Sequence, residues 1–210
     1  MADSIDLDAL ARRLSDLGRD RRAICAVAGA PGSGKSTLAE QLVERLDESE
    51  PGIAALLPMD GYHYDDLYLV PAGLRPRKGS PETFDVGGLR HTIQRLKAND
   101  EDTVAVPVFD RDIEIARAGA RLIPRSVRVI VCEGNYLLLR RAPWDSLLPL
   151  FDVTVLIDVP EEELRRRLRA RWEHYNLTED QIAWKLDGND LPNGRVVIDE
   201  SAPAQYVVRP

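Results

Sequence analysis

The sequence predicts an α/β fold in which a parallel sheet is flanked by helices. The main evidence is a set of apolar runs without polar alternation, typical of strands buried on both faces, at residues 24–28, 53–57, 127–132 and 151–159. Segments with apolar residues at helical spacing lie between these runs. The chain has 210 residues, of which 44% are hydrophobic and 30% charged. We therefore expect one sizeable domain spanning residues 1–210.

A glycine-rich stretch follows the first apolar run and matches the phosphate-loop pattern. Its glycines let backbone N–H groups approach phosphate oxygens. Lys35 supplies a positive charge for the β- and γ-phosphates, and Ser36 offers a hydroxyl to Mg²⁺. A helix follows with Leu38, Leu42 and Leu46 at helical spacing, so the context argues against a chance glycine-rich turn. We predict a P-loop NTPase fold whose ATP site is made of Gly29, Ala30, Pro31, Gly32, Ser33, Gly34, Lys35, Ser36 and Thr37.

Composition and charge narrow the classes of function. The net charge is −7, which disfavours a nucleic-acid partner. Cys25 and Cys132 lie in apolar runs, so we expect buried free thiols and a reducing compartment. The acidic N-terminus is not typical of a signal peptide, and no apolar stretch is long enough to span a membrane. We expect a cytoplasmic protein without a membrane partner, and its oligomeric state, a homodimer included, stays open.

An aspartate and several ring-bearing residues follow the second apolar run, at the strand end where ligands of open parallel sheets lie. Asp60 could accept a proton from an attacking hydroxyl or hold Mg²⁺ through water. His63 and Tyr64 are candidates for contact with a substrate. The alternative for Asp60 is a turn aspartate that satisfies its own loop.

Residues 74–82 form a basic segment rich in chain breakers, which predicts a loop. Its cations, Arg77 and Lys78 among them, could meet an anionic substrate or lie on a solvated surface turn. With Asp60 they would form a substrate-side insert over residues 60–85. Asp85 is placed to cap a helix over 86–98.

Residues 103–109 predict a third strand, and Pro107 places its end or an edge there. Phe109 and Arg111 lie near this strand end and are further substrate-side candidates. Residues 113–123 favour an irregular segment or a short hairpin. The apolar run 127–132 ends in Glu133, which would orient Mg²⁺ or its waters from across the sheet.

A charged helix begins at Pro160 and carries three glutamates followed by five arginines. Pairs spaced i,i+4 (161–165, 162–166 and 163–167) would account for part of this charge. Arg169 and Arg171 are left over. We interpret residues 160–190 as an arginine-rich lid and its following helix, which would close over a triphosphate and exclude water. A helix stabilised only by its own ion pairs is the alternative.

The other elements carry no evident chemistry. Residues 1–20 contain an amphipathic helix, and a short helix is expected over 144–150. Thr178 and Gln181 form a capping box at the start of a helix over 178–186. Residues 187–194 predict a polar turn, and 196–198 a last strand.

Several motifs in order resemble those of the P-loop small-molecule kinases of the uridine kinase, phosphoribulokinase and bacterial pantothenate kinase superfamily. Within it, the chain is most similar to the kinases named for fructose transport systems. The ordered set is specific for the superfamily and much less so for a substrate. The residues that carry the resemblance are Gly29–Thr37, Pro58–His63, Pro81–Asp85, Pro107–Asp110, Glu133–Tyr136 and the arginine helix from Leu164.

The resemblance implies a five-stranded parallel sheet with flanking helices and a mobile lid. It implies that Asp60 is the general base and Glu133 the acid that organises magnesium. Arg167 and Arg171 match the lid arginines to within about one helical position. Phe109 lies where uridine kinases carry a tyrosine against the base.

Two departures put uridine in doubt. Uridine kinases carry an aspartate for the ribose hydroxyls where this chain has Gly79, flanked by Arg77 and Lys78. The histidine that follows their strand-end tyrosine is also missing. The basic flank suggests an acidic or already phosphorylated acceptor.

The sequence therefore predicts an ATP-dependent, Mg²⁺-requiring kinase acting on a hydroxyl of a small metabolite such as a sugar or nucleoside. A regulatory or switch ATPase without a small acceptor is the second class. The Asn-Lys-x-Asp segment of GTPases and the transporter signature Leu-Ser-Gly-Gly-Gln are both absent from the sequence. An idle binding protein is a third class, and Lys35, Ser36, Asp60 and Glu133 together argue against it.

Overall fold

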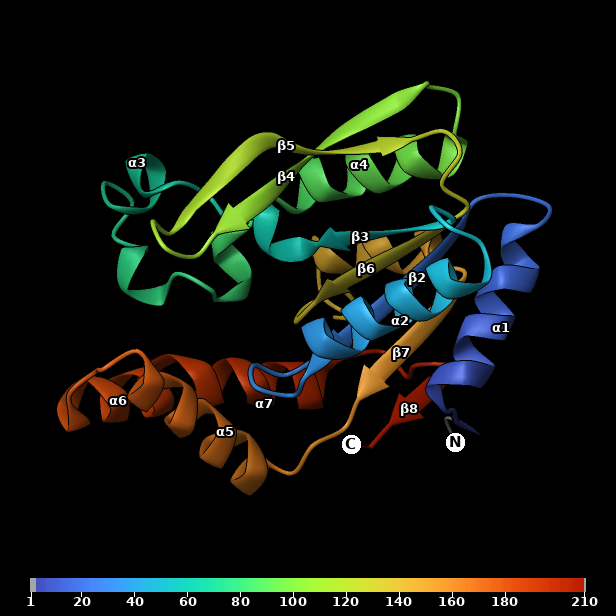
Figure 1. The fold of residues 1–210 in the computed structure, drawn as a ribbon. Helices are drawn as coiled ribbons and strands as arrows, with labels where there is room; N and C mark the ends of the chain where they lie inside the picture. Colours follow the sequence, from blue (N-terminus) through green and yellow to red (C-terminus); the bar gives the residue numbers. More distant parts are fainter. Residues whose placement is uncertain (1–2, 210) are drawn as a thin grey trace.

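A six-stranded parallel sheet forms the centre of the computed structural model, which describes residues 3–209 (Figure 1). The strand order is β1-β8-β7-β2-β6-β3, and all five pairings are parallel. The α/β prediction is confirmed, with six strands instead of five. The strands are β1 Asp3–Ser4, β2 Ala23–Gly29, β3 Ala54–Pro58, β6 Val129–Gly134, β7 Val153–Ile157 and β8 Tyr206–Val208.

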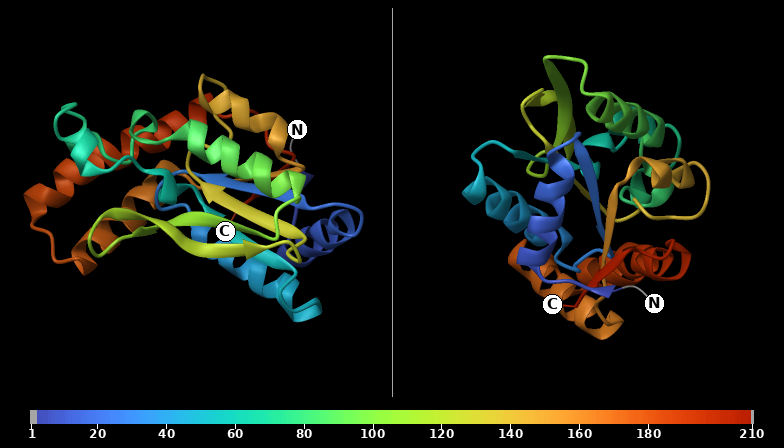
Figure 2. Two further views of the ribbon diagram at one scale, coloured as in Figure 1. Left: turned by 90° about the horizontal axis from the view of Figure 1, so that it is seen from above. Right: turned by 90° about the vertical axis from the view of Figure 1, so that its right-hand side faces the viewer.

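Helices cover both faces of this sheet. The central strand β2 is therefore buried along its whole length. Ile24 and Ala26 face one layer, and Cys25 and Val27 face the other. Figure 2 (right) shows α1 and α2 on one side and α4 on the other. The bounds are α1 Leu7–Gly18, α2 Lys35–Ser49 and α4 Val86–Ala98, and a short 3₁₀ helix, Trp144–Leu150, packs beside α4.

The predicted third strand lies in a separate antiparallel hairpin and not in the central sheet. The hairpin consists of β4 Thr103–Asp110 and β5 Ile115–Pro124. Residues 113–123, expected as an irregular segment or a short hairpin, are thus mostly one strand that pairs with β4. The first half of β4 alternates exposed and buried residues, which suits a strand covered on one face only. Arg22 is buried and donates hydrogen bonds to backbone carbonyls, among them that of Pro124, and so ties the base of the hairpin to the sheet.

The segment between β3 and α4 is an insert of short turns, with 3₁₀ helices at Met59–Tyr62, Arg75–Arg77 and Pro81–Thr83 and the one-turn helix α3 at Asp66–Leu69. The predicted cap is confirmed, because the Asp85 side chain caps α4. The Asp65 side chain likewise caps α3.

The C-terminal third is helical, with α5 Glu161–His174, α6 Glu179–Lys185, a π-helical turn Leu186–Asp190 and α7 Leu191–Glu200. The capping box at Thr178 is confirmed. The predicted polar turn over 187–194 and the strand over 196–198 are wrong. Val197 is buried while Ile198 is 52% exposed, and Leu191 and Gly194 are buried at helical spacing from Val197. The short apolar run 196–198, which was expected to be a strand, is therefore part of helix α7.

Both cysteines are buried and free, as predicted. Burial raises the pKa of Cys25 to about 12 and that of Cys132 well above its usual range, so both thiols stay protonated. Within residues 3–209, no helix has the length and apolar character needed to cross a bilayer.

Candidate active site

A cavity of about 400 Å³ opens where the carboxyl ends of β2, β3 and β6 meet. Its walls come from the phosphate loop, the insert, the hairpin and the C-terminal helices, which Figure 1 shows converging at this end of the sheet. The predicted site residues in its lining are Pro31, Gly32, Lys35, Asp60, His63, Lys78, Phe109, Arg111 and Arg171.

The phosphate loop has the local geometry that an anion site requires. Gly34 has a φ of 94° and precedes α2, where the left-handed conformation favours glycine. The first N–H groups of α2 have no partner inside the helix and carry its positive end. Arg167 donates to the carbonyl of Ser33 at 3.2 Å, and Leu168 packs beside Gly32. Helix α5 thus contacts the phosphate loop directly.

Lys35, Ser36 and Glu133 form the buried end of the site. The Ser36 hydroxyl donates to Glu133 Oε2 at 3.1 Å. Burial raises the pKa of Glu133, Lys35 opposes this rise, and the nearby Asp60 adds to it. Burial also lowers the pKa of Lys35, although Glu133 and Asp60 favour its charged form.

The residues at this end fit a magnesium ion. Glu133 is 4% exposed, and within residues 3–209 its carboxylate has the Ser36 hydroxyl as its sole hydrogen-bond partner and no ion pair. A buried carboxylate with so little compensation favours a cation, and hydroxyl and carboxylate oxygens are the donors that Mg²⁺ prefers. The described residues contain no cluster of three or more His, Cys, Asp or Glu placed to hold a metal by themselves. That suits Mg²⁺, which usually completes its shell with waters and phosphate oxygens.

Asp60 lies in the 3₁₀ turn after β3 and points toward the hairpin. Arg111 Nη2 lies 2.5 Å from Asp60 Oδ2, and His63 Nδ1 donates to the Asp60 carbonyl at 2.8 Å. Burial opposes ionisation of Asp60, but positive charge on His63, Arg111 and Lys35 outweighs it, so its pKa lies below the ordinary value. Burial lowers the pKa of His63 itself, which leaves Arg111 and Lys35 as the partners at neutral pH.

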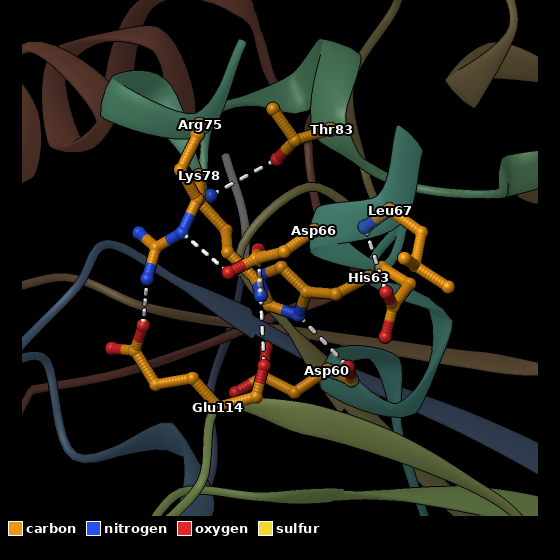
Figure 3. Close-up of polar contacts among 10 residues, drawn as sticks. Asp60, His63, Asp66, Leu67, Arg75, Lys78, Thr83 and Glu114 are labelled. Atoms are coloured by element: carbon orange, nitrogen blue, oxygen red, sulfur yellow. Dashed lines mark hydrogen bonds and ion pairs between the residues drawn. The ribbon is translucent and has the colours of Figure 1, made fainter. Parts of the chain in front are cut away.

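Paired charges join the insert to the tip of the hairpin (Figure 3). Arg75 bridges Asp66 and Glu114, and Lys78 pairs with Asp66 at 2.7 Å while donating to the Glu114 carbonyl at 2.8 Å. The Lys78 ammonium also lies 5.6 Å from the ring centroid of Phe109. These residues are up to 48 positions apart, so folding brings them together.

An aromatic stack supports the wall next to Asp60. The His63 ring lies 4.0 Å from Phe84 and 4.7 Å from Phe109, centroid to centroid. The rings of these two pairs are tilted by 41° and 39°, and the contacts hold the imidazole in place beside the cavity.

Besides Glu133 and six residues of the stretch 29–37, three predicted site residues lie outside the lining. Arg77 is exposed and pairs with Glu82 at 3.0 Å, because the 3₁₀ turn points it away from the cavity. Tyr64 stacks on Tyr68, with 5.0 Å between the ring centroids. Arg167 reaches the outside of the phosphate loop instead of the cavity.

The predicted pairing within the arginine helix is only partly correct. Glu163–Arg167 forms as an i,i+4 pair at 2.7 Å. The expected 161–165 and 162–166 pairs are wrong: Glu161 binds Arg195, Arg165 binds Asp187, and Arg166 turns to Glu163 instead. Long arginines reach acids on neighbouring segments as easily as on their own helix.

The two arginines left over by that pairing differ. Arg169 pairs with Glu173 and Glu179. Arg171 has no ion pair within residues 3–209 and lines the cavity, with its guanidinium 5.0 Å from the Trp172 ring.

Sequence reasoning missed several lining residues. Asn135 directly follows the Glu133-Gly134 strand end, a position that could have indicated it. Glu114 lies in a hairpin turn at a φ of 54°, and Asn189 and Asp190 lie in the stretch predicted as a turn, so no local signal placed them. The full set of missed residues is Arg75, Gly79, Phe84, Glu114, Asn135, Trp172, Tyr175, Leu177, Lys185, Asn189 and Asp190.

Comparisons with known proteins identify the family of this chain. The family model described as "AAA domain" matches residues 24–192. An Escherichia coli protein, "Uncharacterized protein YggC", is 32% identical over 197 residues, covering 93% of this chain and 81% of that protein. A Schizosaccharomyces pombe protein, "Putative uridine kinase C227.14", is 31% identical over 191 residues, covering 87% and 80%. This chain belongs to the P-loop kinase superfamily of uridine kinase, phosphoribulokinase and pantothenate kinase.

A solved structure extends the likeness of this P-loop kinase over the whole fold. The crystal structure of a "putative fructose transport system kinase" from Silicibacter sp. TM1040 superposes with a TM-score of 0.89 at 38% identity, covering 98% of this chain and 100% of the other. The predicted resemblance is confirmed. P-loop kinases of this superfamily phosphorylate small metabolites, and ATP binding is a property of the family.

Proposed function

We propose that this chain transfers the γ-phosphoryl group of ATP to a hydroxyl of a small metabolite, with Mg²⁺ as cofactor. One observation carries the proposal: Lys35 of the phosphate loop and the ionised carboxylate of Asp60 line the same cavity. A phosphate-binding group and a proton acceptor in one enclosed space are what transfer to a hydroxyl needs.

The cations of the cavity support ATP as the phosphate donor. Lys35, Arg171 and Lys185 line it, and none of the three has an ion pair within the described residues. Positive groups that form no ion pair favour a polyanionic ligand. A triphosphate along Gly29–Thr37 would supply the missing negative charge.

Asp60 acts as the base in the proposed reaction. The acceptor oxygen attacks the γ-phosphorus while its proton passes to Asp60, and the bond from the γ-phosphorus to the bridging oxygen breaks, releasing ADP. Lys35 and Arg171 offset the charge that develops on the transferring group. Ser36 and Glu133 would hold Mg²⁺, which when bound neutralises charge on the phosphates.

Residues 160–190 serve as the proposed lid and residues 60–85 as the acceptor side. The contacts of α5 with the phosphate loop support this role, because they place Arg171 over the cavity. Closure of such a segment excludes water and limits ATP hydrolysis.

The charges on the acceptor side bear on the acceptor itself. Arg77, one of the cations that suggested an anionic acceptor, lies outside the lining, while Arg75, Lys78 and Arg111 already pair with acids. The free positive charge available to the acceptor is therefore smaller than the sequence suggests, and neutral acceptors such as sugars and nucleosides fit as well as acidic ones.

The test is coupled ADP release with Mg-ATP against a panel of sugars, sugar phosphates, nucleosides and pantothenate-like acids. We expect at least one acceptor to stimulate release many-fold and to be recovered as its phosphate ester. Slow release that no acceptor changes would contradict the proposal and favour a switch ATPase.

A further inference from the structure

A second buried carboxylate lines the cavity, and the proposed phosphoryl transfer does not use it. Asp190 is 8% exposed. The Trp172 indole donates to its Oδ2 at 2.7 Å, and within residues 3–209 its Oδ1 has no hydrogen-bond partner and its carboxylate no ion pair. The two nearby cations, Arg171 and Lys185, lie over the Trp172 ring at 5.0 and 4.8 Å from its centroid. Asp190 Oδ1 is not among the fully enclosed side-chain atoms that lack a partner, so this oxygen is open to the cavity, where a ligand can donate a hydrogen bond to it.

The backbone around Asp190 departs from regular α-helix. Asp190 closes the π-helical turn Leu186–Asp190, and such turns occur frequently at functional sites. The preceding residue, Asn189, donates to the Lys78 carbonyl at 3.3 Å and is held in turn by Asn193. The turn therefore docks against the acceptor-side insert and places Asp190 between the lid and the insert.

Gly79 lies next to this contact. Gly79 has a φ of 102°, a conformation that side chains rarely adopt, and a Cβ atom there would lie 3.8 Å from the Asn189 amide nitrogen. The Tyr136 hydroxyl donates to the Gly79 carbonyl at 2.7 Å and fixes the loop. The polar side chains that this part of the cavity offers thus come from the π-helical turn instead of position 79.

A second acceptor oxygen in the lining also lacks a partner. Asn135 Oδ1 is buried without a hydrogen bond within the described residues, at the end of β6. Asn135 Oδ1 is an amide oxygen, which accepts hydrogen bonds and cannot donate them. The same holds for Asp190 Oδ1 when the carboxylate is ionised. Phosphate and carboxylate groups bring no donors to such atoms, whereas hydroxyl groups do.

We propose that Asp190 binds the acceptor by accepting hydrogen bonds from hydroxyls other than the one phosphorylated, so that the acceptor is a polyhydroxylated compound such as a sugar, a sugar derivative or a ribose-bearing nucleoside. This inference rests on the proposed kinase function and narrows its substrate class. Asn135 supplies a second acceptor atom in the same cavity, and Trp172 holds the Asp190 carboxylate in place.

The experiment compares acceptors that differ by one hydroxyl, by coupled ADP release with saturating Mg-ATP. The pairs are D-ribose and 2-deoxy-D-ribose, uridine and 2′-deoxyuridine, and D-glycerate and 3-hydroxypropanoate. For whichever pair is used, we expect the richer hydroxyl compound to have a kcat/KM about tenfold to a hundredfold higher, the range for one hydrogen bond to a charged group.

The variant Asp190→Asn should raise KM for the member of the pair with the additional hydroxyl by a similar factor, while kcat changes less. The ratio of kcat/KM between the two members of the pair should therefore fall toward one. Asp187→Asn is the matched control, because Asp187 lies on the same turn but is exposed and pairs with Arg165. A binding readout is the change in tryptophan fluorescence on adding the acceptor, which should be lost in Trp172→Phe.

An Asp190→Asn variant that keeps the wild-type ratio and KM would overturn the inference while the kinase function stands. A wild-type ratio near one for every pair used would overturn it without any variant, even if Asp190→Asn did not fold. Absence of stimulated ADP release with all six compounds would contradict both the inference and, together with the wider panel, the proposed function.

Discussion

The two sides of the cavity differ in whether their positively charged side chains form ion pairs. In the phosphate loop and the proposed lid, Lys35, Arg171 and Lys185 lack ion pairs within residues 3–209. On the acceptor side, Arg75, Lys78 and Arg111 all pair with acids from the insert or the hairpin. The unpaired cations on one side favour binding of a polyanionic ligand. The paired cations on the other side connect the insert to the hairpin.

This difference shows which side is built by local sequence. The phosphate loop links two consecutive core elements, β2 and α2, so the elements that frame it are neighbours in the sequence. The acceptor side depends on contacts between Asp60 and Arg111, 51 residues apart, and between Arg75 and Glu114, 39 residues apart. In the proposed function, the residues that select the acceptor therefore lie in the part of the molecule that depends on contacts between distant segments.

Removing the central unpaired cation should have the largest effect. We expect Lys35→Ala to reduce kcat/KM for ATP by at least about a hundredfold, because the charge opposite the phosphates is lost in a buried site. Steady-state kinetics and titration with a fluorescent ATP analogue would measure it. Wild-type activity in this variant would contradict the assignment of the nucleotide side.

Breaking the Asp60–Arg111 pair should shift the pH dependence. Arg111 lowers the pKa of Asp60, so Arg111→Ala raises that pKa, and Asp60 then takes up its proton at a higher pH. We expect the acidic limb of the kcat/KM profile to move to higher pH. Arg117→Ala on the same hairpin, which removes an exposed pair with Asp110, is the matched control. An unmoved acidic limb would show that Asp60 does not govern it.

The smallest effect is expected at Arg77, which sequence analysis placed with the substrate. Arg77→Ala should leave kcat/KM within about twofold of wild type, because exposed ion pairs contribute little. A tenfold loss of kcat/KM for the acceptor would indicate that Arg77 contacts the acceptor. It would also weaken the contrast between the two sides of the cavity.

Much of the nucleotide side could be predicted because its signals are local. An apolar run, a glycine-rich loop and a helix followed one another in the sequence, and Glu133 stood at the end of a buried strand. The hydrogen bond between Ser36 and Glu133 agrees with their expected proximity. Capping at Asp85 and Thr178 followed the same local rules.

The acceptor side was harder because its geometry depends on long-range packing. Asp187–Ile198 looked like a turn and a strand, but burial of Leu191, Gly194 and Val197 on one face makes most of it helical and brings Asp190 into the cavity. Arg77 and Lys78 are neighbours in the sequence, but their side chains point in different directions at the end of a short 3₁₀ turn. Composition does not predict such a difference in direction.

The most direct test of the account replaces Asp60, the residue where the two sides meet. Asp60→Asn keeps the size of the side chain and removes its capacity as a base, and exposed Asp65→Asn is the control. With the best acceptor, we expect unchanged ATP binding and a loss of about 10²- to 10⁴-fold in acceptor-stimulated ADP release, the usual range for a general base. Near-normal turnover by Asp60→Asn would contradict it.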